Sequence, residues 1–296
     1  MKWPVYVLIV LVLLAAAALV WQYAADKPGE TPGEPTSPSE PTTPVEPPDS
    51  GTTSSEVRVY LTRGEKVGGA GRTVQVAESA DSVGERITAA LESLLAGPTA
   101  EEREWGLATA IPEDTELIDV SLNGGIATVN LTRAFESGGG ALSMMLRTAQ
   151  VVSTVTQFDG ITTVAFKLDG TLVQSIGGEG VTVSPAVTRA DFEDVTPAIL
   201  VESPVPGEQV TSPVLATGTA NTFEAQFMVE VVDPEGLVIT EQSVMATSGT
   251  GTRGTFSASV EFHTTRAGLG TMVFYEPSAE DGSRTKIIEI PVRMQP

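Results

Sequence analysis

The pattern of apolar and polar residues divides the chain into an apolar start, a polar stretch and a long patterned region. Residues 4–25 read PVYVLIVLVLLAAAALVWQYAA and carry no charge. A helix over this segment would be roughly 30 Å long, which matches the hydrocarbon core of a bilayer. Aromatic rings flank the segment and Lys2 precedes it, a pattern typical of a membrane segment with a cytoplasmic N-terminus. We therefore expect residues 1–25 to form a single-pass membrane anchor, with residues 4–25 in the bilayer and both later domains extracytoplasmic.

A cleaved signal peptide is the alternative interpretation of this segment, and a buried core helix is a weaker one. Signal peptidase prefers small residues at positions −3 and −1 of its cleavage site. Cleavage after Ala24 or Ala25 would place Gln22 or Tyr23 at position −3, and both are poor there. The chain has no cysteine, so the lipoprotein route is closed. The pattern favours an uncleaved signal-anchor and leaves cleavage open.

Residues 26–56 form a polar stretch in which proline recurs among Glu, Ser, Thr and Gly. Because so few apolar side chains are available for burial, we expect a disordered linker. Proline and like charges would extend it, to on the order of 95 Å as polyproline II. It could be a spacer that carries the folded part through a wall layer or a passive tether, and the sequence does not separate these two roles.

Residues 57–194 combine the two-residue period of strands with the 3.6-residue period of helices. Trp105 and Leu107 are the expected buried contacts of an acidic stretch near residue 101, and Ile118, Val120 and Leu122 are expected to share one inward face. The order of elements predicts an α+β domain in which an antiparallel sheet carries two helices on one face. These elements are strands at 57–63 and 72–78 across a Gly-rich turn, a helix at 82–96 with a Ser82–Glu85 capping box, a hairpin through Asn123-Gly124-Gly125, a helix at 141–157 and a hairpin through Asp169-Gly170.

Helical periodicity disappears from residues 195–296, where about seven short strands are separated by turn residues, as in a sandwich. In the segment TFSASVEF, the apolar residues at 256, 258, 260 and 262 alternate with polar ones. This alternation predicts a strand with one buried and one solvated face. We therefore expect an all-β immunoglobulin-like sandwich without a disulfide.

Composition and charge exclude several classes of function. The formal net charge is −21, which makes binding to nucleic acid unfavourable because both surfaces would be negative. Without cysteine the chain has no disulfides, thiolate zinc sites or thiol nucleophiles. It has a single histidine, His263, so sites with several histidine ligands are excluded too.

The residues that could carry chemistry favour a protein that is not an enzyme. His263 has no recognisable nucleophile motif to serve, so we expect a surface histidine. Acidic runs are usually solvated faces, so paired acids for glycan hydrolysis are disfavoured. We therefore predict no catalytic, cofactor-binding or metal-binding residues and no cofactor. The acidic candidates weighed in this way are Glu101, Glu102 and Glu104 for catalysis, Asp191, Glu193 and Asp194 for calcium between the domains, and Glu224, which we expect to be an exposed acid at the start of a strand.

Residues 91–98, 110–135 and 149–170 together resemble the sporulation and spore germination domain family, often called GerMN. Residues 196–226, 249–256 and 276–283 resemble the immunoglobulin-like domain of bacterial spore germination proteins. The resemblance covers about residues 57–193 and most of 196–296. It implies extracytoplasmic envelope proteins of spore-forming or related bacteria, without known catalysis, that serve in assembly at the cell or spore surface.

Two functional hypotheses remain beside a disfavoured hydrolase. The leading one is a non-catalytic, membrane-anchored protein that presents two interaction modules to protein partners in sporulation, spore germination or cell-envelope assembly. The alternative is a module that binds peptidoglycan or another carbohydrate. Sugar-binding sandwiches use exposed aromatic rings, and Tyr275 and Trp105 are the few candidates here.

Overall fold

The computed structural model describes residues 52–77, 82–178 and 180–296. The expected anchor and almost all of the expected linker lie outside these residues. Among the residues described, no helix combines the length and apolarity needed to cross a membrane. The first strand begins at Thr52, so the last few residues assigned to the linker are already part of the fold.

The first layer is a long two-stranded hairpin of β1 (Thr52–Arg63) and β2 (Lys66–Ala77). The strands are antiparallel and reverse at Gly64 and Glu65. We expected the following glycines to belong to a Gly-rich turn, but Gly68, Gly69 and Gly71 lie within β2. The partner strand is therefore longer than predicted, because a two-residue turn suffices to reverse the chain.

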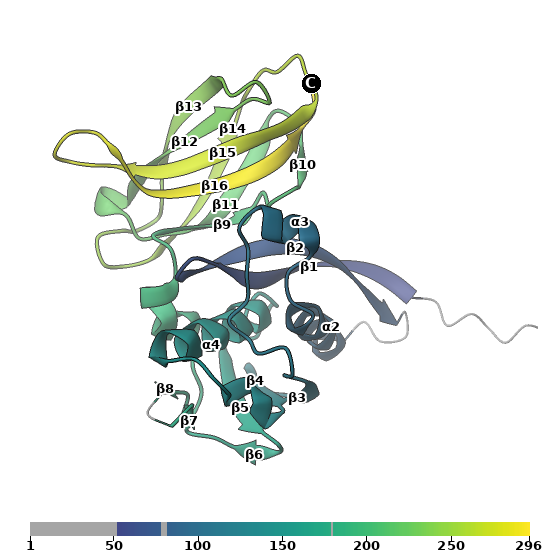
Figure 1. The fold of residues 1–296 in the computed structure, drawn as a ribbon. Coiled ribbons are helices and arrows are strands. Elements are labelled where there is room, and N and C mark those ends of the chain that lie inside the picture. Colours follow the sequence, from purple (N-terminus) through teal and green to yellow (C-terminus); the bar gives the residue numbers. More distant parts are fainter. Residues whose placement is uncertain (1–51, 78–81, 179) are drawn as a thin grey trace, which may run out of the picture. The chain divides into compact units, whose positions relative to one another are not determined.

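Two helices pack between this hairpin and a second sheet (Figure 1). Helix α2 (Val83–Leu95) begins at Ser82, whose side chain accepts a hydrogen bond from the Glu85 N–H. Helix α4 (Ala141–Val155) follows the glycines near residue 139. Both helices confirm the prediction from the apolar spacing. A short helix α3 (Ala100–Glu104), which the sequence pattern did not predict, carries a complete capping box between Thr99 and Glu102.

The second sheet of this region is mixed, not purely antiparallel. Its strand order is β3-β4-β5-β6, and β4 and β5 run parallel because α4 forms the crossover between them. The helices are also covered on two sides, by the hairpin and by this sheet, and not on one face of a single sheet as predicted. The strands are β3 (Leu117–Asn123), β4 (Ile126–Leu131), β5 (Thr163–Leu168) and β6 (Thr171–Leu172), followed by the small pair β7 (Ser175–Ile176) and β8 (Val181–Thr182).

The hairpin through Asn123-Gly124-Gly125 is present as predicted. The side chains of β3 that point toward the core, however, are not those that the sequence predicted. A shift of register between Leu117 and Asp119 turns Leu117 toward the core and leaves Ile118 exposed. Val120 still packs against the core, whereas Leu122 is exposed. A one-residue irregularity reverses the facing of neighbouring side chains, because successive residues of a strand point to opposite faces.

From Ile199 onward the chain forms a β-sandwich with its own hydrophobic core, whereas the residues between β8 and β9 pack in the first core. One sheet has the order β10-β16-β15-β12-β13 and the other β14-β11-β9. In β14 the burial alternates as expected, with Phe256 and Val260 inward. The short strand β10 was not predicted, and it pairs in parallel with β16. The strands are β9 (Ile199–Ser203), β10 (Gln209–Val210), β11 (Val214–Ala220), β12 (Gln226–Val232), β13 (Val238–Met245), β14 (Gly254–Val260), β15 (Gly268–Pro277) and β16 (Arg284–Met294).

Candidate functional site

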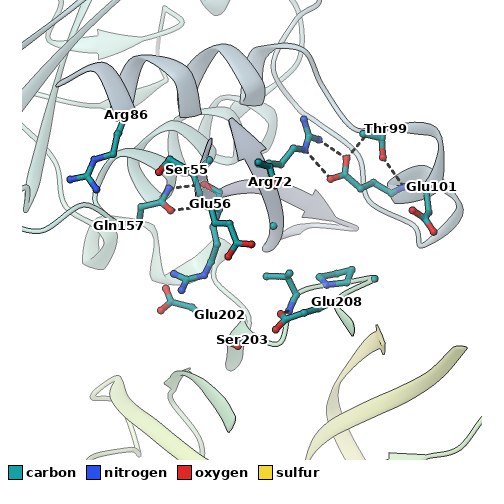
Figure 2. A pocket seen from close by; sticks show the side chains of 18 of the residues that line it. Ser55, Glu56, Arg72, Arg86, Thr99, Glu101, Gln157, Glu202, Ser203 and Glu208 are labelled. Carbon is teal, nitrogen blue, oxygen red and sulfur yellow. Dashed lines mark hydrogen bonds and ion pairs between the residues drawn. The ribbon is translucent and has the colours of Figure 1, made fainter. Parts of the chain in front are cut away.

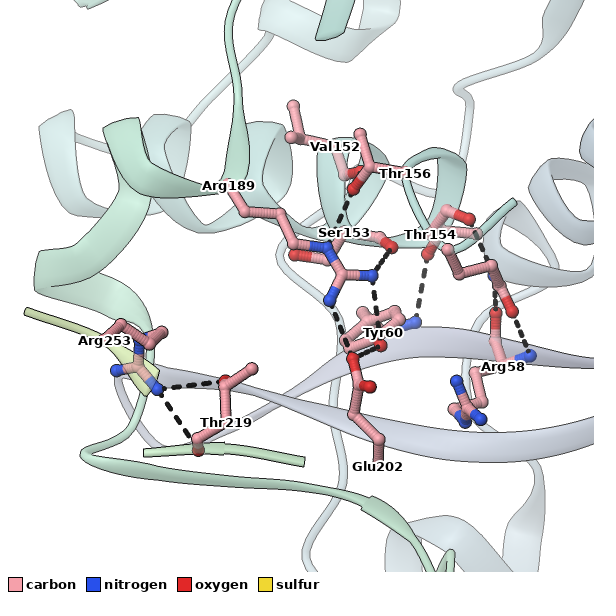
Figure 3. Close-up of polar contacts among 11 residues, drawn as sticks. Arg58, Tyr60, Val152, Ser153, Thr154, Thr156, Arg189, Glu202, Thr219 and Arg253 are labelled. Atoms are coloured by element: carbon pink, nitrogen blue, oxygen red, sulfur yellow. Dashed lines mark hydrogen bonds and ion pairs between the residues drawn. The ribbon is translucent and has the colours of Figure 1, made fainter. Parts of the chain in front are cut away.

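The outer face of the β1–β2 hairpin meets the sandwich through a polar cluster (Figure 3). Tyr60 is completely buried, and its hydroxyl donates to Glu202 Oε1 over 2.6 Å. Arg189 donates to the same oxygen over 2.7 Å, and its guanidinium lies 4.8 Å from the centre of the Tyr60 ring. Residues more than a hundred positions apart are therefore joined at one carboxylate. We call Tyr60, Arg189 and Glu202 the junction cluster.

The three groups of the junction cluster shift one another's pKa values. Burial raises the pKa of Tyr60 to about 12. Burial would also raise the pKa of Glu202, but the hydrogen bonds from Tyr60 and Arg189 outweigh it and hold this pKa below its ordinary value. Each polar group of the cluster thus has a hydrogen-bond or ion-pair partner within the cluster. This favours a structural role that holds the elements together over a reactive site.

Further polar contacts surround the junction cluster. Glu193 binds Arg253 through both carboxylate oxygens, and the hydrogen bond from Arg253 lowers the pKa of Glu193. The ammonium of Lys66 donates to the backbone carbonyl of Asp194, and Arg293 pairs with Glu101 of helix α3. These contacts tie the hairpin, α3 and the sandwich together within the unit Ser50–Pro296.

The edge of β1 is closed by side chains of helix α4. Gln150 donates to the carbonyl oxygen of Tyr60, and the Tyr60 N–H donates to Thr154 Oγ1. One turn later, Gln157 accepts from the Arg58 N–H and donates to the Arg58 carbonyl oxygen. Because an open strand edge would otherwise expose these backbone groups, the polar residues of α4 replace a third strand. This also explains why Gln150 and Thr154 are completely buried.

A cavity of about 870 Å³ lies next to the junction cluster, over the part of the hairpin that the sandwich leaves uncovered (Figure 2). Its lining includes Ser55 to Arg58 of β1, Gly71 to Thr73 of β2, Arg86 of α2, Thr99, Glu101, Glu102 and Trp105 around helix α3, Gln157 to Asp159 after α4, and Glu202, Ser203 and Val205 to Glu208 of the sandwich. The cavity therefore combines residues from both folded regions. Its size falls within the range of ligand-binding sites.

Glycine permits the close approach that forms one wall of the cavity. An added Cβ at Gly207, which has a φ of +81°, would lie 2.2 Å from Cη2 of Trp105. A Cβ at Gly71 would lie 2.6 Å from Cγ2 of Val205. Glycine inside a strand often marks such an approach by a second backbone. The glycines of β2 were thus the one sequence signal that could have revealed this contact.

Charge within the cavity is only partly neutralised. Arg72 forms a two-pronged ion pair with Glu102 and also donates to the carbonyl oxygens of Ser93 and Gly97. Arg58 and Arg86 line the cavity as well, and neither side chain forms an ion pair with any residue that the structure describes. Sequence reasoning singled out neither residue, because the cavity is formed by segments that are far apart in the chain.

Several of the acidic candidates from the sequence have structural partners. Glu102 is buried with Arg72, which corrects the expectation of a solvated run, while Glu101 and Glu104 are exposed. Asp191 accepts hydrogen bonds from Thr188 and caps the short helix Arg189–Val195. The Asp191 cap and the Glu193–Arg253 pair therefore give these acidic residues a structural role at the boundary between the two domains. Within the described ranges, no three histidine or acidic residues gather in a geometry suited to a metal ion.

The remaining candidates lie apart from the cavity. His263 is exposed beyond the end of β14. Glu224 is exposed as expected, but it belongs to a short 3-10 helix and not to a strand. Tyr275 is only 5% exposed and donates to Glu241, so its ring face is not open to a sugar. Trp105 is half-buried against Gly207, so both proposed stacking rings are already in contact with protein.

Comparison with known proteins identifies both folded regions. The family described as "Sporulation and spore germination" matches residues 58–174. The family described as "Immunoglobulin-like domain of bacterial spore germination" matches residues 198–283. A search of curated proteins found no match.

Solved structures that match this chain include domains of the sporulation protein GerM from Bacillus subtilis. The first GerMN domain of that protein is 20% identical over 46% of this chain and 98% of that domain, with a TM-score of 0.36. Its tandem GerMN domains are 16% identical over 70% of this chain and 61% of theirs, with a TM-score of 0.37. These scores are too low to support residue-level transfer. The two family matches show that residues 58–174 belong to the sporulation and spore germination domain family and residues 198–283 to the immunoglobulin-like domain family of bacterial spore germination.

Proposed function

We propose that the chain is a non-catalytic, membrane-anchored extracytoplasmic protein that presents its two domains to protein partners during sporulation, spore germination or cell-envelope assembly. The family matches support a role in sporulation or germination. The apolar segment 4–25 supports the anchor. The proposed partners are envelope or spore-surface proteins, and the strongly negative charge of the chain disfavours nucleic acid.

The observation that carries this proposal is the junction cluster. Tyr60, Arg189 and Glu202 are all engaged with one another, so they hold the two domains in place and do not form an open reactive site. A rigid pair of domains offers a partner a pre-formed surface, which lowers the entropy lost on binding. The cavity beside the cluster is a concave part of that surface with residues from both folded regions.

Site-specific crosslinking in the native cell tests the partner. A photo-reactive residue at Thr73, which is exposed in the cavity, should capture one defined envelope protein. The same residue at Asp281, in the loop between β15 and β16, serves as a matched control and should not capture that protein. Equal capture at both positions, or none at either, would contradict the proposal.

Cell fractionation tests the anchor separately. The full-length chain should remain in the membrane after alkaline extraction, and external protease should digest the domains in cells without an outer barrier. A chain shortened by residues 1–25 would support cleavage instead. A full-length chain found dissolved in the cytosol would refute membrane anchoring.

A further inference from the structure

Unpaired positive charge gathers in the cavity. Arg58 and Arg86 are half-buried, and no side-chain hydrogen bond or ion pair joins either to another described residue. The Nε of Arg86 is buried and also lacks a partner within the described ranges. The guanidinium of Arg86 lies 5.9 Å from the centre of the Phe158 ring. Two charged donors in one cavity are thus available to an acceptor from outside.

This arrangement is unusual for a chain with a net charge of −21. Acidic side chains outnumber basic ones, and they neutralise Arg72, Arg189 and Arg253 nearby. A buried charged donor without an acceptor is unfavourable, so such groups usually meet a ligand, an ion or water. A carboxylate that entered the cavity would satisfy Arg58 and Arg86 by charge-assisted hydrogen bonds.

Acidic groups also line the cavity, and one of them, Glu202, is already held by Tyr60 and Arg189. In Figure 2, Arg86, Ser55 and Gln157 lie at one end, Glu208 lies at the opposite end and Glu56 lies between them. Glu56 forms no ion pair with a described residue, and Glu208 accepts one hydrogen bond, from the Val205 N–H. A ligand with only negative charge would therefore be attracted at one end and repelled at the other.

We propose that this cavity binds a peptide segment of mixed charge, with a carboxylate side chain at Arg58 and Arg86 and a Lys or Arg side chain facing Glu56 and Glu208. The inference rests on the proposed function, since the segment belongs to the protein partner. The site supplies charges of both signs that form no ion pair with described residues, Arg58 and Arg86 on the one hand and Glu56 and Glu208 on the other. It therefore selects the composition of the bound segment.

A peptide fits this lining better than a sugar or a phosphate chain. Sugar sites present open aromatic faces, but Trp105 packs on Gly207 and Phe158 lies beside Arg86. A phosphate chain would meet Glu56 and Glu208. Charge-complementary peptide binding requires neither an open ring nor a uniformly positive surface.

Calorimetry on the full chain in detergent tests the inference. The probes are eight-residue Gly/Ser peptides that contain one Glu and one Lys, separated by zero to four residues in either order. At least one spacing and order should bind, and replacing its Glu by Gln should weaken binding about tenfold, which corresponds to about 1.4 kcal/mol. Replacing its Lys by Gln should weaken binding similarly.

Variants of the protein identify the site. Arg58→Gln and Arg86→Gln should each weaken binding of that peptide about tenfold, whereas Arg86→Lys should retain part of it. Arg103→Gln is the matched control, because Arg103 is exposed and does not line the cavity. Circular dichroism melting would show whether each variant is folded. If an arginine variant does not fold, Glu56→Gln takes its place, and it should weaken only the contact with the Lys of the peptide.

The inference is overturned if no peptide binds with a dissociation constant below 1 mM, which corresponds to a binding free energy of about −4 kcal/mol. It is also overturned if Arg58→Gln and Arg86→Gln leave the dissociation constant unchanged. Binding of a neutral sugar or inorganic phosphate in place of the peptides would also overturn it. The crosslinking experiment at Thr73 is independent of these outcomes. Capture of a partner without peptide binding would refute this inference alone, whereas failure of the crosslinking would count against the proposed function.

Discussion

Tyr60 shows how one side chain can join two domains. Its ring is covered by Arg189, its hydroxyl donates to Glu202, and its backbone binds helix α4. In the sequence it alternates with the apolar residues Val59 and Leu61, so the strand pattern did not mark it as buried. Its complete burial means that the outer face of the hairpin is covered at this position.

The hydroxyl of Tyr60 predicts a pH dependence of stability. Because folding raises its pKa from 10.0 to about 12, its contribution is fully present below pH 10 and is lost as the pH rises through about 12. Tyr60→Phe should lower the free energy of unfolding by about 1 kcal/mol at neutral pH. It should also make the loss of stability above pH 10 smaller. Urea denaturation between pH 7 and pH 11.5 measures both effects, and parallel wild-type and variant curves would contradict the expectation.

Gly207 gives a second prediction at the scale of one residue. Gly207→Ala introduces a Cβ 2.2 Å from Trp105 at a φ of +81°, so it should destabilise the chain through both strain and a clash. Gly236→Ala is the matched control, because Gly236 has a φ of +84° but no atom within 4 Å of its added Cβ. The control should cost about 1 kcal/mol, and Gly207→Ala about 2 kcal/mol more. Equal losses in thermal melting would show that Trp105 does not constrain this wall.

Helix α4 is the element that closes the edge of β1. Its apolar stripe was predictable, but its polar residues serve the neighbouring strand and not the solvent. Gln150 is completely buried and bonds both the Tyr60 carbonyl oxygen and the Ala110 N–H. A helix can thus complete a sheet when its amides are spaced to match the strand.

Replacing Gln150 tests this role of the helix. Gln150→Leu keeps the helix propensity and approximate volume but leaves the Tyr60 carbonyl oxygen and the Ala110 N–H without partners. We expect a loss of about 3 kcal/mol. The control is Leu142→Gln in the same helix, where the side chain is already 42% exposed, and it should change stability by less than about 0.5 kcal/mol. Chemical denaturation compares the two, and a small loss at Gln150 would mean that the edge of β1 is satisfied in another way.

At the scale of the whole molecule, the two family domains lie in one compact unit, Ser50–Pro296, and the hairpin contacts both. Gly69 lies opposite Tyr60 in the hairpin, and its added Cβ would lie 3.8 Å from the Val201 carbonyl oxygen of the sandwich. That distance admits a methyl group but not a larger side chain. The junction therefore depends on a small residue at this position.

Enlarging Gly69 should separate the unfolding of the two domains. Wild-type chain should unfold in a single calorimetric transition, because the junction contacts couple the domains. Gly69→Leu should split this transition into two, since the longer side chain meets the backbone of β9. Gly69→Ala is the control and should retain one transition. Two transitions in the wild type, or one in Gly69→Leu, would refute the coupling.

Local order along the chain could be predicted without the structure. The helices near residues 83–95 and 141–155, the turns at Asn123-Gly124-Gly125 and Asp169-Gly170, and the alternation in β14 all follow from nearest neighbours. Such features depend on the spacing of apolar residues and on turn residues, which can be read from a single sequence.

Tertiary contacts were needed for the parallel pairing of β4 with β5, for the covered face at Tyr60 and for the cavity with Arg58 and Arg86. These depend on residues as far apart as Tyr60 and Glu202, and no local pattern records which distant segments will meet.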